Sequence, residues 1–215
     1  MKHRNSHLLV GYWDRIRAGR PVPDQTDIDP KAIKRLLPYA FILNCEHPAR
    51  PYYRLAGTGL CERFGAELKG TGFLAFWDSS SATAIAALLR QSLCLRQPVC
   101  LFSMATTESG GIAELETVVT PVSFNGGEAK RLFGLVQVLS DPGILVEQKI
   151  VHQRLIGSQL VAEGDVTLEP FTARPRLPLA PLRLVVSQGS PRPHAEDANP
   201  LFSGMSELMK RLYRA

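Results

Sequence analysis

The sequence predicts an α+β fold, in which helices pack on one face of a five-stranded antiparallel sheet. Two short apolar segments typical of strands, 39–45 and 52–56, flank a loop that holds two prolines. Residues 80–95 place apolar side chains at helical spacing and give the clearest prediction of a helix in the chain. Three more segments have the character of strands and are separated by glycine-rich loops: 98–106, 112–124 and 132–139.

The N-terminal part, residues 1–37, is predicted to be a helical flank. Leu8, Leu9, Tyr12, Trp13 and Ile16 recur at helical spacing on one apolar face. Gly19 and the prolines that follow it are expected to end this helix. A second, short helix is expected from Asp29, which can cap it, to Pro38, which ends it.

The predicted core of the domain, residues 38–141, turns sharply after the strand at 52–56. Gly57 and Gly59 interrupt that strand, a short helix is expected at 60–64, and Gly65 ends it. The same glycines resemble phosphate-binding motifs only in part. Glu62 stands where a dinucleotide fingerprint needs its third glycine, and no Lys precedes Thr71 as a P-loop requires. The glycines are therefore expected to serve backbone geometry.

The second half of this core begins with the helix at 80–95, whose start is expected at serines 79–81. Asn125-Gly126-Gly127 predicts a tight hairpin between the last two strands. Ser140-Asp141-Pro142-Gly143 is expected to end the regular domain.

Residues 142–215 are predicted to be a C-terminal extension. A helix is expected over 144–161, an extended proline-containing segment over 168–181 and one more strand over 182–186. Leu201, Met205, Leu208 and Leu212 fall on one face of a predicted amphipathic helix. That helix is expected to pack on its own domain or on a second subunit.

Composition excludes several classes of protein. The chain has 215 residues, a net charge of +5 and 45% hydrophobic residues, so it can bury a substantial core. Its four cysteines form no C-x-x-C pair, and no metal site is predicted. No apolar segment is long enough for a signal peptide or a membrane span, which favours the cytoplasm. The basic residues lack interleaved aromatics, so nucleic-acid binding is not expected.

No catalytic constellation is predicted. Glu114 and Glu116 share one strand face and could serve as an acid–base pair, although such a pair more often marks the solvent side of a strand. Arg54 could bind an anionic ligand or pair with a local acid such as Glu62. The aromatic residues Phe73, Phe76, Trp77, Phe102 and Phe133 are expected to form the core, which in a small sheet can also be the pocket.

The order of elements, with several short motifs, resembles a PAS domain, and more specifically a bacterial subfamily of small, often single-domain PAS proteins. The similarity in motifs covers about the first 80 residues, and the similarity in topology extends to about residue 140. The motifs are Tyr12-Trp13-Asp14, Arg17-x-Gly19-Arg20, Pro23, Asp27-Ile28-Asp29-Pro30, Leu36-Leu37-Pro38, Tyr53-Arg54-Leu55-Ala56-Gly57-Thr58 and Phe64-Gly65-x-Glu67-Leu68-x-Gly70.

The resemblance implies a non-enzymatic module for sensing or protein interaction in bacterial signalling, in which a small ligand lies between sheet and helices. Cys61 lies outside the motif in which flavin-binding members carry their reactive cysteine, and no histidine lies in the corner at 53–70, the helix at 80–95 or the last three strands to bind haem, so neither cofactor is expected. The candidate cavity residues are Arg54, Thr58, Cys61, Trp77, Phe102 and Phe133. A homodimer and a signalling partner are expected, with Tyr12, Trp13, Leu208 and Leu212 as candidate contacts. A small enzyme and a ligand-free adaptor are the alternatives.

Overall fold

The computed structural model describes residues 1–47 and 49–161. The predicted extended segment at 168–181, the strand at 182–186 and the terminal amphipathic helix lie outside these residues. The elements run in the order α1 (Arg4–Arg17), η1 (Gln25–Asp27), η2 (Leu37–Tyr39), β1 (Ala40–Asn44), β2 (Tyr52–Ala56), α2 (Thr58–Phe64), η3 (Phe73–Phe76), α3 (Ser79–Leu95), β3 (Val99–Thr107), β4 (Ile112–Val122), β5 (Arg131–Val138), η4 (Pro142–Leu145) and β6 (Ile150–Leu160), where η marks a short 3₁₀ helix.

The centre of the fold is an antiparallel sheet with strand order β2-β1-β5-β4-β3-β6. The α+β class is confirmed, but the sheet has six strands rather than five. The sixth strand, β6, pairs with β3 along its whole length, from Val99 opposite Leu160 to Thr107 opposite Ile150. The helix predicted over 144–161 is therefore wrong, and only the short turn η4 precedes the strand.

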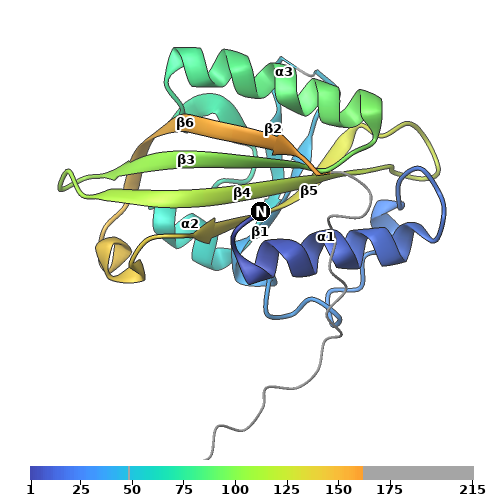
Figure 1. The fold of residues 1–215 in the computed structure, drawn as a ribbon, viewed down its shortest axis with the longest axis horizontal. Helices are drawn as coiled ribbons and strands as arrows, with labels where there is room; N and C mark the ends of the chain where they lie inside the picture. Colours follow the sequence, from blue (N-terminus) through green and yellow to red (C-terminus); the bar gives the residue numbers. More distant parts are fainter. Residues whose placement is uncertain (48, 162–215) are drawn as a thin grey trace, which may run out of the picture. The chain divides into compact units, whose positions relative to one another are not determined.

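Helices cover both faces of the sheet, whereas the sequence predicts helices on one face only. Figure 1 shows α3 on one side of the sheet and α1 on the other. Between the sheet and α2, η3 and α3 lies a core that includes Phe41, Tyr53, Leu101 and Leu115, which we call the helix-side core. Between the sheet and α1 lies a second one, the α1-side core.

The α1-side core joins the apolar face of the N-terminal helix to four strands. Its buried residues are Leu9, Val10, Tyr12, Trp13, Ile33, Leu36, Ala40, Ile42, Cys100, Val118, Val122, Phe133, Leu135 and Val161. The helical face predicted from the spacing of Leu9, Tyr12 and Trp13 is thus the face that packs on the sheet. Ala18, in the left-handed conformation, and Gly19 end the helix near the predicted point.

Two helix boundaries differ from the prediction. Residues 30–36 form successive turns and no helix, and Pro38 lies inside the 3₁₀ helix η2. A proline disfavours the α conformation in the residue before it, so the seven residues between Pro30 and Pro38 leave little room for an α-helix. The cap of α3 is Asp78, which accepts a hydrogen bond from the Ser81 amide, rather than one of the serines.

The glycines at the corner after β2 have the predicted geometric role. A Cβ atom at Gly57 would collide with the carbonyl oxygen of Leu37, and the Gly57 amide donates to the Ala40 carbonyl. Gly65 ends α2 in the left-handed conformation, with φ of 63°. The corner therefore brings α2 close against η2, and these two elements together form one wall of a cleft.

Candidate functional site

The helix-side core is built around four aromatic rings. Phe41, Tyr53 and Phe73 contact one another with ring centroids 5.5–5.8 Å apart, and Trp77 lies 6.1 Å from Phe73. These side chains come from β1, β2 and the η3 segment, so the packing ties the first hairpin to the helical layer. Aromatic pairs in such edge-on, stacked and tilted arrangements stabilise a core beyond the area that they bury.

Trp77 is the unusual member of this group. Its side chain is 7% exposed, and its indole Nε1 has no hydrogen-bond partner within the described part of the chain. The backbone of Trp77 bridges to Gln153 on β6, whose amide oxygen accepts a 3.4 Å hydrogen bond from the buried Ser103 hydroxyl. A buried donor without an acceptor is costly. The Trp77 indole N–H could therefore donate a hydrogen bond to an acceptor from outside the protein.

On the opposite face, two aromatic side chains fix α1 to the rest of the domain. The Trp13 indole Nε1 donates a 2.7 Å hydrogen bond to the Pro121 carbonyl on β4. The Tyr12 hydroxyl accepts one of 2.7 Å from the Asp29 amide. Both residues are buried, with 6% of Tyr12 and 4% of Trp13 exposed.

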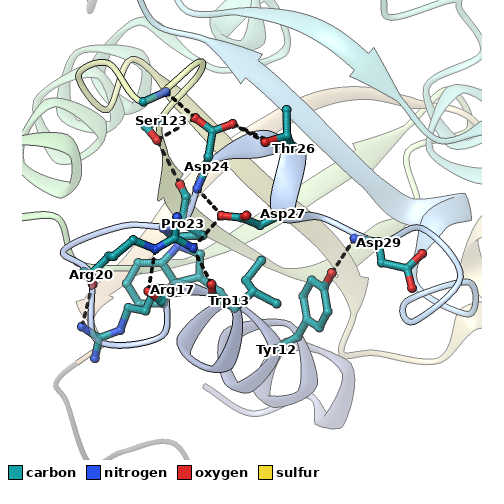
Figure 2. A network of polar contacts seen from close by, with 12 residues as sticks. Tyr12, Trp13, Arg17, Arg20, Pro23, Asp24, Thr26, Asp27, Asp29 and Ser123 are labelled. Carbon is teal, nitrogen blue, oxygen red and sulfur yellow. Dashed lines mark hydrogen bonds and ion pairs between the residues drawn. The ribbon is translucent and has the colours of Figure 1, made fainter.

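A polar network holds the segment after α1 against the β4–β5 turn (Figure 2). The Asp24 carboxylate accepts hydrogen bonds from the Thr26 amide and hydroxyl, the Ser123 hydroxyl and the Gly126 amide. Burial opposes ionisation of Asp24, but these donors outweigh it and lower its pKa to about 2. Asp27 closes the network: it accepts from the Asp24 amide and forms an ion pair with Arg20 at 2.7 Å.

The other end of α1 is held by a buried carboxylate. Glu116 on β4 is fully buried, and its two oxygens accept hydrogen bonds from the Lys2 and His3 amides just before the helix. His3 caps the helix, since its ring Nδ1 accepts from the Asn5 amide at 3.0 Å. Burial lowers the pKa of His3, opposed by Glu116 and assisted by Arg63, and the neutral ring is the form that can accept this bond.

The paired carboxylates predicted from the sequence thus have separate environments. Glu114 is exposed, whereas Glu116 lies under α1, in register with Phe102 on β3 and Gln137 on β5. Sequence reasoning missed the role of Glu116. A carboxylate on a strand face that is otherwise apolar was the available signal.

The six candidate cavity residues do not come together in one place. Arg54 and Thr58 are exposed, and Cys61 is half-buried at the edge of the helix-side core. Trp77 lies within the helix-side core, but Phe102 and Phe133 belong to the opposite, α1-side core. Arg54 forms no ion pair with Glu62 or with any other described residue. Of the set, Trp77 and Cys61 alone border the same core.

The candidate dimer contacts are placed differently from the expectation. Tyr12 and Trp13 pack within their own chain, so a second subunit would reach them only after α1 had moved away from the sheet. Leu208 and Leu212 lie outside the described residues. Asp24 and its network were not predicted, although the Asp24-x-x-Asp27 spacing is that of a capping box.

Residues 1–47 and 49–161 contain neither a metal-binding cluster nor a membrane-spanning helix. No group of three or more His, Cys, Asp or Glu side chains in these ranges is placed to hold a metal ion. No helix within the same ranges is long and apolar enough to cross a bilayer.

Comparison with known families agrees with the topology and with the N-terminal motifs. A family model described as PAS domain matches residues 1–137. The chain belongs to the PAS domain family. The match takes in α1, the Asp24 network and the sheet as far as β5, and it ends before β6. No curated protein matches the chain.

Several solved structures resemble this PAS domain in fold. A light-oxygen-voltage domain studied with a flavin analogue is 12% identical, with 53% of this chain and 86% of that chain covered and a TM-score of 0.42. The LOV protein of Rhodobacter sphaeroides is 14% identical, with coverages of 54% and 71% and a TM-score of 0.40. VqmA bound to DPO is 15% identical, with coverages of 54% and 58% and a TM-score of 0.41.

Proposed function

We propose that this PAS domain is a sensory module that holds a small molecule in the helix-side core, against Trp77. The observation that carries the proposal is the buried indole Nε1, which has no acceptor on any residue that the structure describes. Buried donors are nearly always bonded, to protein, water or ligand. A ligand with a carbonyl, hydroxyl or ether oxygen would supply the missing acceptor.

The surroundings of Trp77 define the chemistry of that ligand. Phe73 and the other aromatic rings give it an apolar wall, while Ser103 and Gln153 give one polar corner. A small, mostly apolar molecule with one or two oxygen atoms would suit these neighbours. Flavin and haem remain outside the proposal, as the sequence predicts.

The sensory role includes an output through protein contacts. We place the module in the cytoplasm of a bacterium, as a homodimer that acts on a signalling partner without catalysing a reaction. Support comes from the family alone, because PAS domains are generally sensory or interaction modules. The part of the chain after residue 161 carries the predicted amphipathic helix with Leu208 and Leu212, and we propose that it contributes to the dimer.

A ligand-free adaptor is the second candidate, and the packing of the first hairpin favours it. Phe41, Tyr53 and Phe73 are each no more than 2% exposed and in mutual contact. A core so closely filled gives a rigid docking surface. In that case a water molecule, rather than a ligand, would satisfy Trp77.

Mass spectrometry of the purified protein under native and denaturing conditions separates the two candidates. The sensory role predicts an added mass that is present in the native wild-type protein and is released on denaturation. The Trp77→Phe variant should lose it. Trp13→Phe is the matched control, because it removes the same atoms from the opposite face, and it should keep the added mass. A native wild-type mass equal to that of the polypeptide would favour the adaptor.

A further inference from the structure

A cleft lies outside both cores, between α2 and the connection from β5 to β6. Its volume is about 440 Å³, within the range of small-molecule sites. One wall comes from α2 and from Tyr39 on η2. The other comes from residues 142–149, which lie beyond the residues matched by the family model. The lining residues that carry the argument are Tyr39, Glu62, Arg63, Glu147 and Lys149.

Arg63 is the distinctive side chain of this cleft. Its guanidinium carbon lies 3.9 Å from the centre of the Tyr39 ring, so the planar group stacks on the aromatic face. One of its terminal nitrogens is buried and has no acceptor in the described ranges. Arginine keeps its charge in proteins, so this is a partly desolvated cation with unused hydrogen-bond capacity.

The other charges of the cleft are better solvated. Glu62, Glu147 and Lys149 are exposed, and Lys149 lies 4.0 Å from Glu108 while its aliphatic chain crosses Gly65. Charges in contact with water are strongly screened, whereas a charge already stripped of water attracts an opposite charge more strongly. Arg63 therefore dominates the interaction of the cleft with a small ion.

We propose that this cleft is a second binding site, which takes a small molecule bearing an oxyanion, a carboxylate or a phosphate, against Arg63. The planar fork of the guanidinium matches two oxygens of such a group. Glu62 and Glu147 oppose the anion weakly from the rim. The site is separate from the core at Trp77 and does not depend on the proposed sensory ligand.

The test is an NMR titration of the ¹⁵N-labelled full chain with citrate and, separately, with inorganic phosphate, each compared with chloride at equal ionic strength. Shifts should concentrate on the Arg63 side chain and on residues 142–149. Arg63→Gln should raise the dissociation constant about tenfold or more, because it removes a hydrogen bond between two charged groups. Arg90→Gln, which changes an exposed arginine on α3 away from the cleft, should leave it unchanged.

A substitution of opposite sign sharpens the test. Glu147→Gln removes a rim carboxylate and should lower the dissociation constant about two- to fivefold. Arg63→Lys keeps the charge without the planar fork, and its dissociation constant should lie between those of the wild type and Arg63→Gln. If Arg63→Gln does not fold, Arg63→Lys takes its place in the test. The proposal would be overturned if the Arg63 variants had the same dissociation constant as Arg90→Gln. It would also be overturned if chloride produced the same NMR shifts.

Discussion

At the scale of single residues, two tryptophans show how position decides the role of the same side chain. Trp13 and Trp77 are both buried, on opposite faces of one sheet. Trp13 gives its indole hydrogen to the Pro121 carbonyl, and so its polar atom holds α1 in place. The Trp77 indole N–H donates to no described atom, and this unpaired donor is the observation on which the proposed ligand site rests.

Asp24 allows a prediction on the dependence of stability on pH. Its pKa is about 2 in the folded protein against a usual 3.8, so the folded state favours the ionised form. The stabilisation is fully present above about pH 4 and is lost as the pH falls towards about 2. Through this group the wild-type protein should lose roughly 1–2 kcal/mol of unfolding free energy between pH 4 and pH 2. The Asp24→Asn variant should lose less over the same interval, by that amount. Urea unfolding at a series of pH values from 5 to 2 measures it.

The comparison that decides is the slope, since other carboxylates also titrate in this range. Asp141→Asn, at an exposed carboxylate that caps η4 beyond the sheet, should keep the wild-type slope. An Asp24→Asn protein with that same slope would show that the network contributes nothing to acid stability.

Individual residues also show what the sequence alone could not decide. Strand alternation tells that Phe102 and Leu101 point to opposite faces, but it does not tell which face lies under which helix. Here both faces are covered, and β4 and β5 are buried almost throughout. An amphipathic strand would have revealed the solvent side, whereas a strand buried on both faces does not. Phe102 and Phe133 were therefore assigned to the wrong side of the sheet relative to Trp77.

At the scale of elements, α1 is held to the sheet at both ends by polar groups and along its length by apolar ones. Glu116 and His3 hold its beginning, and Trp13 with the Arg20–Asp27 pair holds its end. Polar anchors depend on charge and protonation more than an apolar contact does. The attachment of α1 therefore depends on charged groups at both of its ends.

The anchor at Glu116 leads to a prediction about the first turn of α1. In Glu116→Gln one carboxylate oxygen becomes an amide nitrogen, which faces a backbone N–H and cannot accept from it. The amides of Ser6 and His7, which bond to the His3 carbonyl, should then exchange hydrogen about tenfold faster or more. Hydrogen exchange followed by NMR measures this, with the strands as internal reference.

Glu114→Gln provides the control for this change. It alters a carboxylate two residues away on the same strand, but one that is exposed and not bonded to α1. Equal exchange rates in the two variants would contradict the anchoring role of Glu116.

The strand β6 explains the one large error in the predicted elements. Leu145, Gln148, Val151, Leu155 and Gln159 recur at helical spacing, and this pattern led to the predicted helix. A register shift between Phe102 and Ser103 leaves Ile156 as an extra residue, and this breaks the alternation that would have indicated a strand. By contrast, the strands up to residue 138 lie between glycine and proline turns, and their limits were predicted to within two residues.

At the scale of the whole molecule, the sheet extends past the limit that motifs and family model suggest. The predicted core ends at residue 141 and the family match at 137, yet β6 covers the outer edge of β3 as far as Leu160. Its buried side chains, Ile150 and Gln153, face the helix-side core and α3. Without β6, the edge of β3 and part of that core would meet water.

Truncation tests whether the structural domain ends at 141 or at 161. A chain of residues 1–161 keeps β6 and its pairing with β3, and it is the reference in thermal and urea unfolding. A chain of residues 1–141 should lose about 3 kcal/mol or more, because it gives up the burial of Ile150 and of the surfaces that β6 covers. It should also expose apolar surface to the dye ANS. Equal stability of the two chains would show that β6 is an accessory strand and that the domain is complete at residue 141.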